Sequence, residues 1–242
     1  MADRHFEHPR LAAIYDAVNG DRSDLRLYED IVREVGGRRV LDVGCGTGAL
    51  ALRLVDRGLE VTGVDPAQAS LDVAMGKPGA DGVRWLVGDA TSLPPMQVDV
   101  VTMTANVAQA IVEASEWEST LRGIHAALRP GAHLVFETRD PSRRVWQNWN
   151  PPASRKTTSI PGVGTVESWV DLIDVVGPLV TFRSTFVFSA DGTVLTSDST
   201  LRFRTRDEVE ADLVAHGFVL QNVRRALEGP EGELVFVARR SG

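Results

Sequence analysis

Leu41-Asp42-Val43-Gly44-Cys45-Gly46-Thr47-Gly48 is the stretch of sequence that decides the fold. It joins a short apolar segment, residues 40–43, to a segment in which Leu50, Leu54 and Val55 recur at helical spacing. Glycines in a strand-to-helix turn permit tight bending and let a ligand approach backbone N–H groups at the start of the helix. The stretch therefore predicts a ligand site outside the carboxyl end of a buried strand.

Strand-like and helix-like segments alternate after this turn. Helices are predicted at 11–18 and 25–35 before it, and strands at 60–64, 83–87, 98–103 and 132–138, separated by helices, after it. This alternation is typical of an α/β fold with a doubly wound, mostly parallel sheet that is covered by helices on both faces.

The pattern changes after Asp140. A loop with one short helix is predicted over 143–160, followed by three antiparallel strands over 164–175, 179–189 and 193–205. A helix over 207–216 and two strands, 218–225 and 233–239, with a turn at 229–232 between them, complete the pattern. Four regions are expected: an N-terminal helical cap (1–36), a cofactor-binding core (37–140), an antiparallel β insert or lid (141–205) and the closing helix and strand pair of the core (206–242).

Composition restricts the function further. The chain has 242 residues, 43% of them hydrophobic, and a net charge of −7, which disfavours a nucleic-acid partner. The single cysteine, Cys45, excludes an internal disulfide and a cysteine zinc cluster. No apolar run approaches the roughly 20 residues that span a bilayer, and residues 1–5 lack the layout of a signal peptide. Since nearly all basic residues are arginines, and Ala, Val, Gly and Asp are abundant, we expect a bacterial protein. From the lack of a signal peptide, a membrane-spanning run and a disulfide, we expect it to be cytoplasmic, with no membrane partner. We expect either a monomer or a homodimer.

Three acidic residues follow the ends of successive predicted strands. Asp42 lies two residues before the first glycine, where a carboxylate suits a ligand ammonium group better than a pyrophosphate. Asp65 ends the second strand and can accept hydrogen bonds from both hydroxyls of a ribose. Asp89, in Gly88-Asp89-Ala90 after the third strand, can accept a hydrogen bond from an adenine amino group. The three acids together predict a nucleoside-containing ligand with an ammonium group.

In combination and order, these motifs resemble those of class I S-adenosylmethionine-dependent methyltransferases. The resemblance extends over about 30–140 and the strand pair at 218–239, and includes residues 128–138. It implies a Rossmann-like, seven-stranded sheet whose last strand is antiparallel to the others, and S-adenosylmethionine as the cofactor. It also implies cofactor contacts at matching positions: Tyr15, Asp42, Gly44, Cys45, Gly46, Gly48, Asp65, Pro66, Asp89, Ala90, Thr104 and Asn106.

Several of these residues also have a purely structural interpretation. Asp65 before Pro66 could be a helix N-cap, and Tyr15 could be a packed core residue. Cys45 is better interpreted as a small buried residue than as a nucleophile. Gly44-x-Gly46-x-x-Ala49 with Asp65 also allows an NAD(P)-dependent oxidoreductase, although Asp42 and the lack of a Tyr-x-x-x-Lys pair disfavour it. A non-catalytic cofactor-binding protein is the third alternative.

The expected reaction is in-line transfer of a methyl group to nitrogen or oxygen of a small-molecule acceptor, with no metal required. The insert would act as a lid that shapes the acceptor pocket, or it would form a dimer interface or a core of its own. The candidate substrate residues are Arg139, which precedes the insert, and Trp146, Trp149 and Trp169 within it. Candidate catalytic residues are His5, His8 and Asn106, with Gln109 and Glu137 as further possible bases. A neutral amine acceptor would need no base.

Overall fold

In the computed structural model, which describes residues 3–225 and 232–242, seven strands form the central sheet in the order β10-β11-β5-β4-β1-β2-β3. β11 pairs antiparallel with β5 and β10, and the remaining pairs are parallel. This confirms the doubly wound sheet with one antiparallel strand. The strands are β1 (Arg39–Val43), β2 (Glu60–Asp65), β3 (Val83–Val87), β4 (Val98–Met103), β5 (Leu128–Arg139), β10 (Phe218–Arg225) and β11 (Glu233–Arg240).

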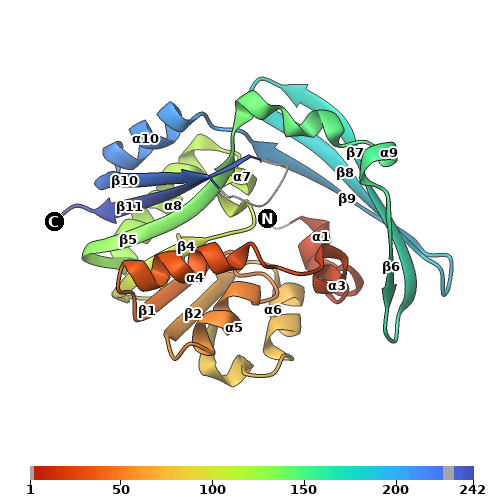
Figure 1. The fold of residues 1–242 in the computed structure, drawn as a ribbon, viewed down its shortest axis with the longest axis horizontal. Helices are drawn as coiled ribbons and strands as arrows, with labels where there is room; N and C mark the ends of the chain where they lie inside the picture. Colours follow the sequence, from red (N-terminus) through yellow and green to blue (C-terminus); the bar gives the residue numbers. More distant parts are fainter. Residues whose placement is uncertain (1–2, 226–231) are drawn as a thin grey trace.

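Helices cover both faces of this sheet (Figure 1). One face packs against α4 (Leu25–Glu34) and α5 (Ala49–Val55), and the other against α7 (Val107–Ala110), α8 (Ala114–Ala127) and α10 (Arg206–Ala215). α6 (Gln68–Met75) and the 3₁₀ turn η1 (Ala80–Gly82) lie near the β3 edge. Among the described residues, no helix is long and apolar enough to cross a membrane.

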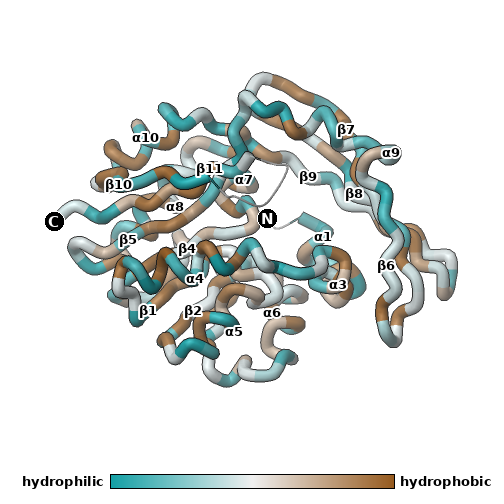
Figure 2. Tube along the Cα trace, in the orientation of Figure 1, coloured by the Kyte–Doolittle hydropathy of each residue, from teal (hydrophilic) through white to brown (hydrophobic). Residues whose placement is uncertain are grey.

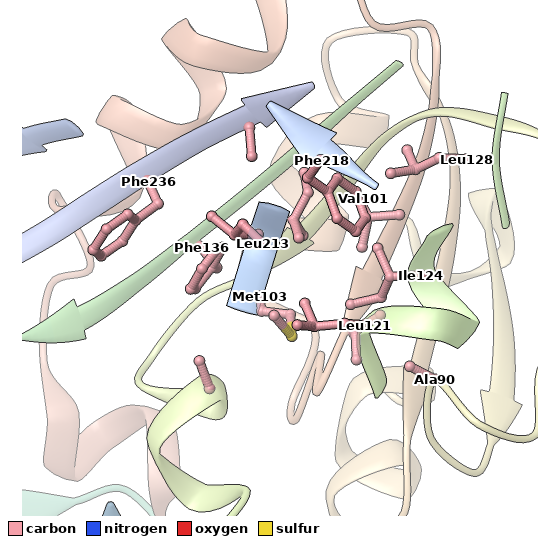
Figure 3. Packing of buried hydrophobic residues seen from close by; sticks show 14 of the residues in the cluster. Ala90, Val101, Met103, Leu121, Ile124, Leu128, Phe136, Leu213, Phe218 and Phe236 are labelled. Carbon is pink, nitrogen blue, oxygen red and sulfur yellow. The ribbon is translucent and has the colours of Figure 1, made fainter. Parts of the chain in front are cut away.

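Two hydrophobic clusters hold the layers together. Leu121 and Ile124 of α8 and Leu213 of α10 point toward the strands beside Met103 and Phe136 (Figure 3). On the opposite face, a second cluster joins α4 and α5 to residues of β1, β2 and β3. Apolar residues accordingly run along the central strands, whereas α4 alternates between hydrophobic and hydrophilic positions (Figure 2). The sheet is a rigid platform whose parallel strands all end at the same edge.

The insert forms a second, antiparallel sheet with four strands, not the three predicted. They are β6 (Lys156–Ile160), β7 (Gly164–Val176), β8 (Leu179–Phe188) and β9 (Val194–Arg202), preceded by the 3₁₀ turns η2 (Pro141–Arg143) and η3 (Val145–Asn148) and by α9 (Pro151–Ser154). β6 was missed because its sequence is mostly polar and exposed, so pairing with β7 makes it a strand. The insert sheet curves around the carboxyl-terminal edge of the central sheet (Figure 1).

The N-terminal segment is three short helices, α1 (Arg4–Glu7), α2 (Pro9–Ala12) and α3 (Tyr15–Asn19), where one helix over 11–18 was predicted. Pro9 starts α2, and His8 caps it by accepting a hydrogen bond from the Arg10 N–H. Leu11, Ile14 and Val18 pack against the insert sheet, so these helices lie between the two sheets. The predicted turn at 229–232 lies outside the described residues except for its last position.

Candidate functional site

The glycine loop begins where β1 ends and is tied to the neighbouring strand. The N–H groups of Gly44 and Cys45 donate to the Val64 carbonyl, at 2.8 and 3.2 Å. The N–H of Gly46 donates to Oδ2 of Asp65 at 2.8 Å, and the N–H of Ala67 donates to Oδ1 at 2.8 Å. Asp65 is therefore both the cap of the following turn and part of the loop, and each oxygen retains a lone pair for a further donor.

The three glycines of the loop serve different needs. All have positive φ, between +53° and +79°. A Cβ at Gly44 would collide with the Val107 side chain, and one at Gly48 would lie 2.6 Å from Cη2 of Trp85. A Cβ at Gly46 would meet nothing within 4 Å. Gly44 and Gly48 thus make room for the protein itself, whereas Gly46 borders open space that a ligand can enter.

Asp42 is a buried acid beside this loop. It is 1% exposed and accepts a 2.7 Å hydrogen bond from the Thr102 hydroxyl. Burial, reinforced by the negative charge of Asp65, raises its pKa to about 7. Two such acids side by side favour a cationic ligand group, because a nearby positive charge stabilises both carboxylates.

Arg22 was missed by the sequence interpretation. It forms a 2.9 Å ion pair with Asp24, and its charge opposes the raised pKa values of Tyr15 and Asp42. Its position in an Asp-rich loop before α4 gives no sequence signal for this. The loop therefore brings a positive charge close enough to Tyr15 and Asp42 to lower the pKa of each.

The other predicted nucleoside contacts lie at the ends of β2 and β3. Pro66 and Asp89 are exposed, and Ala90 is buried. Oδ1 of Asp89 accepts from the N–H and the hydroxyl of Thr91, at 2.8 and 2.6 Å. Its other oxygen, Oδ2, is left for a further partner. The three acids thus stand on adjacent strands at one edge of the sheet, as the sequence predicts.

The N-terminal helices close over the glycine loop. Oδ1 of Asp16 accepts from the Thr47 hydroxyl at 2.6 Å, and Lys77 bonds both the Thr47 carbonyl and Asp16, at 2.6 and 2.5 Å. This places Tyr15 beside the loop, with its ring centroid 5.5 Å from that of His5. Burial, with the charge of Lys156, lowers the pKa of His5 to about 4, so its imidazole is neutral at pH 7.

The remaining candidates for a base or nucleophile are held in structural roles. His8 uses Nδ1 to cap α2. Burial raises the pKa of the Cys45 thiol, which disfavours a reactive thiolate. No group of three or more His, Cys, Asp or Glu side chains that could hold a metal ion occurs in residues 3–225 and 232–242.

The turn after β4 is strained. Ala105 and Asn106 have φ values of +58° and +66°, which non-glycine residues rarely adopt. The Asn106 N–H donates to Oε1 of Glu137 at 2.8 Å, and the Tyr28 hydroxyl donates to Oε2 of the same carboxyl. Burial, with the charge of Glu233, raises the pKa of Glu137 to about 7. Thr104, also predicted, is buried at the start of this turn.

Next to this turn lies a group of buried polar atoms with unused hydrogen-bonding capacity. Oδ1 of Asn106, Nε2 of Gln109 and Oγ1 of Thr138 have no hydrogen-bond partner within the described part of the chain. Oε1 of Gln109 accepts from the N–H and Nη1 of Arg139, at 3.2 and 3.3 Å. Buried polar atoms are normally paired, so each of these three has room in its hydrogen bonding for a ligand or water.

The predicted aromatic substrate residues separate into two groups. The rings of Trp146 and Trp149 pack against Phe203, at 4.6 and 6.2 Å between centroids, and Trp149 lies 5.7 Å from the Arg139 guanidinium carbon. Trp169 does not join them. It alternates with the inward-facing Ser168 on β7 and packs instead under Arg155 on the other face of the insert sheet. Of the three tryptophans named as candidate substrate residues, Trp169 thus lies apart from Trp146 and Trp149.

Arg204 connects the end of the insert to α7. This buried guanidinium donates to the carbonyls of Ala108 and Ile111, at 2.8 and 2.7 Å, and lies over the Trp117 ring. Its two carbonyl partners belong to α7 and the residue that follows α7. The insert and the α7 segment are thus connected by a buried, charged contact.

Comparisons with known sequences agree on the family. A model described as a methyltransferase domain matches residues 40–131. The cypemycin N-terminal methyltransferase of Streptomyces sp is 37% identical over 111 residues, 46% of this chain and 45% of that protein. An uncharacterized methyltransferase of Mycobacterium tuberculosis is 30% identical over 203 residues, 77% of this chain and 78% of that one. The chain thus spans less than half of the first relative and most of the second.

Comparisons with solved structures agree on the fold. The CcbJ methyltransferase from Streptomyces caelestis superposes with a TM-score of 0.78 at 20% identity, covering 100% of both chains. The sugar N-methyltransferase KedS8 from Streptoalloteichus sp gives 0.76 at 20% identity, covering 95% of this chain and 92% of that one. The matches in sequence and fold favour the methyltransferase prediction over the oxidoreductase alternative.

Proposed function

The chain belongs to the class I S-adenosylmethionine-dependent methyltransferases, and from this premise we propose that it methylates nitrogen or oxygen of a small-molecule acceptor. The observation that carries the proposal is the tie between Gly46 and Asp65, beside the open space at Gly46. An acid fixed at the end of β2 next to an unobstructed glycine turn fits the ribose and methionine parts of the cofactor.

The residues present fit S-adenosylmethionine. Asp65 would accept from the ribose hydroxyls, and Asp89 from the adenine amine, with Pro66 and Ala90 beside the base. Asp42 would stabilise the ammonium group, and Gly44, Cys45, Gly46 and Gly48 would form the turn around the methionine part. Tyr15 and Arg22 would meet the carboxylate, because both lie on the segment that closes over the loop. Thr104 and Asn106 would face the methyl end.

The bound cofactor supplies a methyl group that is already activated on a sulfonium. The task left to the protein is to position the acceptor and exclude water. The turn at 104–106, fixed by Glu137, supplies the platform, and the N-terminal helices cover the loop. His5, which lies on α1 with its ring 5.0 Å from the Phe186 ring of the insert, is the candidate catalytic histidine.

We assign residues 141–205 the role of a lid that has a small hydrophobic core of its own. Its Trp146 and Trp149 pack with Phe203, which gives the insert a core of its own. Its contact with Arg139, at the end of β5, is what supports a role at the acceptor site. The relatives named above are bacterial, and one of them, KedS8, is a sugar N-methyltransferase by name, which supports a bacterial enzyme with a small-molecule acceptor.

Calorimetric titration with S-adenosylmethionine, S-adenosylhomocysteine, NAD and NADP tests the proposal. We expect micromolar binding of the first two and none of the dinucleotides. Binding of a dinucleotide alone would refute it. If the first two bind, a screen of amines and alcohols with mass-spectrometric detection of the methylated product separates an enzyme from a non-catalytic binder.

A further inference from the structure

Three buried polar atoms around the carboxyl ends of β4 and β5 carry an inference about the acceptor. We propose that Asn106, Gln109 and Thr138 bind and orient an acceptor in which the methylated amine has a hydroxyl group on the neighbouring carbon. This proposal rests on the proposed methyltransferase function and deepens it. Nothing in the sequence motifs assigned a role to Thr138, and Gln109 was considered only as a base.

The backbone places the three side chains on the same side of the sheet, at the ends of β4 and β5. Asn106 and Gln109 lie on one turn of α7, joined by a 2.9 Å hydrogen bond from the Gln109 N–H to the Asn106 carbonyl. Oε1 of Gln109 reaches the N–H of Arg139, the residue after Thr138. Thr138 lies two residues after Phe136 on β5, so both side chains are on the same face of the sheet, and Phe136 belongs to the cluster that packs against α7. All three side chains therefore belong to the α7 side of the β5 end.

The chemistry of Gln109 is fixed by its partner. The Arg139 N–H and guanidinium can only donate, so the atom of Gln109 that faces them must be the amide oxygen. Its NH₂ group is left without a partner, in a residue that is 0% exposed. Leaving a buried donor unpaired costs about 1–3 kcal/mol. A ligand oxygen next to Gln109 and Thr138 would recover that cost, and a hydroxyl can accept from the first and pair with the second.

Asn106 supplies the complementary group. An asparagine at a helix N-cap normally accepts a hydrogen bond from the helix, but Asn106 makes no such bond because its backbone is left-handed. Its Oδ1 stays available beside Val107, which packs on Gly44 of the cofactor loop. An acceptor N–H bonded to this oxygen would lie between the cofactor loop and Gln109.

Nitrogen is favoured over oxygen because none of the three unpartnered groups is a base: two are side-chain amides and the third is a hydroxyl. Both oxygens of Glu137 already accept hydrogen bonds, from Tyr28 and from the Asn106 N–H. An alcohol must lose its proton as it attacks, whereas a neutral amine attacks with its lone pair. The new N–C bond then forms as the S–C bond breaks, sulfur keeps the electron pair, and the ammonium product releases a proton to water.

The experiment compares two probes, trans-2-aminocyclohexanol and cyclohexylamine, which differ only in the hydroxyl. We expect kcat/KM to be at least about tenfold higher for the amino alcohol, because a site built to bond a hydroxyl rejects the analogue that lacks it. The product should be the N-methyl amine by NMR. Equal rates with both probes, turnover of neither, or an O-methyl product would overturn the proposal.

Isosteric variants locate the discrimination. Gln109→Glu keeps the oxygen that faces Arg139 but replaces the NH₂ donor, and Thr138→Val removes the hydroxyl. Each should lower the ratio of kcat/KM values between the probes to below about threefold, and Thr138→Ser should restore it. Gln147→Glu, the same change at an exposed position on η3, is the matched control. A ratio unchanged in Gln109→Glu and Thr138→Val would overturn the assignment.

The affinity for S-adenosylhomocysteine, measured by calorimetry on every variant, separates the two levels of failure. Retained affinity with no discrimination between the probes sinks this inference alone. No affinity in the wild-type protein sinks the proposed function and this inference with it. A thermal melt of each variant shows whether a lower ratio of kcat/KM values between the probes comes from unfolding. If Thr138→Val is destabilised, the ratio measured for Thr138→Ser is the test.

Discussion

The backbone N–H of Gly46 donates a 2.8 Å hydrogen bond to Oδ2 of Asp65, so one carboxylate joins the glycine loop to the end of the neighbouring strand. The other oxygen of Asp65 accepts from the Ala67 N–H. The residue proposed to read the ribose thus also sets the shape of the loop proposed to hold the methionine part. Loss of this acid would affect both parts of the cofactor site.

Replacing Asp65 should therefore weaken S-adenosylmethionine binding strongly. Charged hydrogen bonds contribute about 1.5–3 kcal/mol each, so we expect Asp65→Ala to raise Kd by more than about tenfold by calorimetry. Asp72→Ala, at an exposed position on α6, is the control and should leave Kd unchanged. An unchanged Kd in Asp65→Ala would remove this residue from the site.

The glycines of the loop should respond differently to alanine. Gly48→Ala places a Cβ 2.6 Å from Trp85, so it should lower Tm clearly. Gly46→Ala meets no atom and should cost only the roughly 1–2 kcal/mol of a left-handed backbone, while weakening cofactor binding. Thermal melts and calorimetry on both variants make the comparison. The opposite ranking of Tm values would contradict it.

The buried Glu137 should make stability depend on pH. Its pKa is about 7 when folded and near 4.5 when unfolded, so the folded chain binds more protons between these values. The free energy of unfolding therefore falls as pH rises from about 4.5 to 7, and levels off above. Glu137→Gln cannot ionise and should lose this decline, a difference of roughly 3 kcal/mol at pH 8. Denaturant unfolding at several pH values measures it, and parallel curves would refute it.

The two faces of the insert sheet should differ in their effect on turnover. Trp149→Ala removes the ring beside Arg139 and should lower kcat/KM for the acceptor by more than about tenfold with cofactor Kd unchanged. Trp169→Ala, on the other face, should change kcat/KM less than threefold. Steady-state kinetics on the two variants would contradict this arrangement if Trp169 were the more sensitive position.

Arg204 should matter for the stability of the fold. Arg204→Met leaves the carbonyls of Ala108 and Ile111 without their buried donor, which should cost about 2–4 kcal/mol of unfolding free energy. Arg202→Met is the milder comparison, because Arg202 makes one 3.2 Å bond to the Val112 carbonyl. Equal losses of unfolding free energy in the two variants, measured by denaturant unfolding, would show that the two hydrogen bonds of Arg204 add no extra stability.

Local patterns predicted the central sheet well. Strands β1 to β4 are short runs rich in valine, and the glycine loop, Asp65 and Asp89 follow strand ends directly in the sequence. These features depend on neighbours within a few residues. The face of β7 on which Trp169 lies could also be predicted, because successive strand residues point to opposite faces. Trp169 therefore lies on the face of the insert sheet opposite to the buried Val166 and Ser168.

Other features depend on contacts between distant parts of the chain. Tyr28 meets Glu137 across 109 residues, and Arg204 reaches Ala108 across 96. β6 is a strand only because Lys156–Ile160 pairs with β7. The atoms of Gln109 and Thr138 without a hydrogen-bond partner can be identified only when the whole fold is known. No period or motif in a single sequence carries such information.

The hydrophobic cluster shared by Leu11, Ile14 and Val18 with Ile160 and Phe186 has a consequence for how such enzymes diversify. The chain's first helices and its insert sheet, more than 130 residues apart, bury one another's apolar surface. An insert sheet acquired by recombination would therefore not pack well against the original N-terminal helices unless both segments were exchanged. In chimaeras built between relatives, we expect a stable fold only when residues 3–19 and 156–195 come from the same parent.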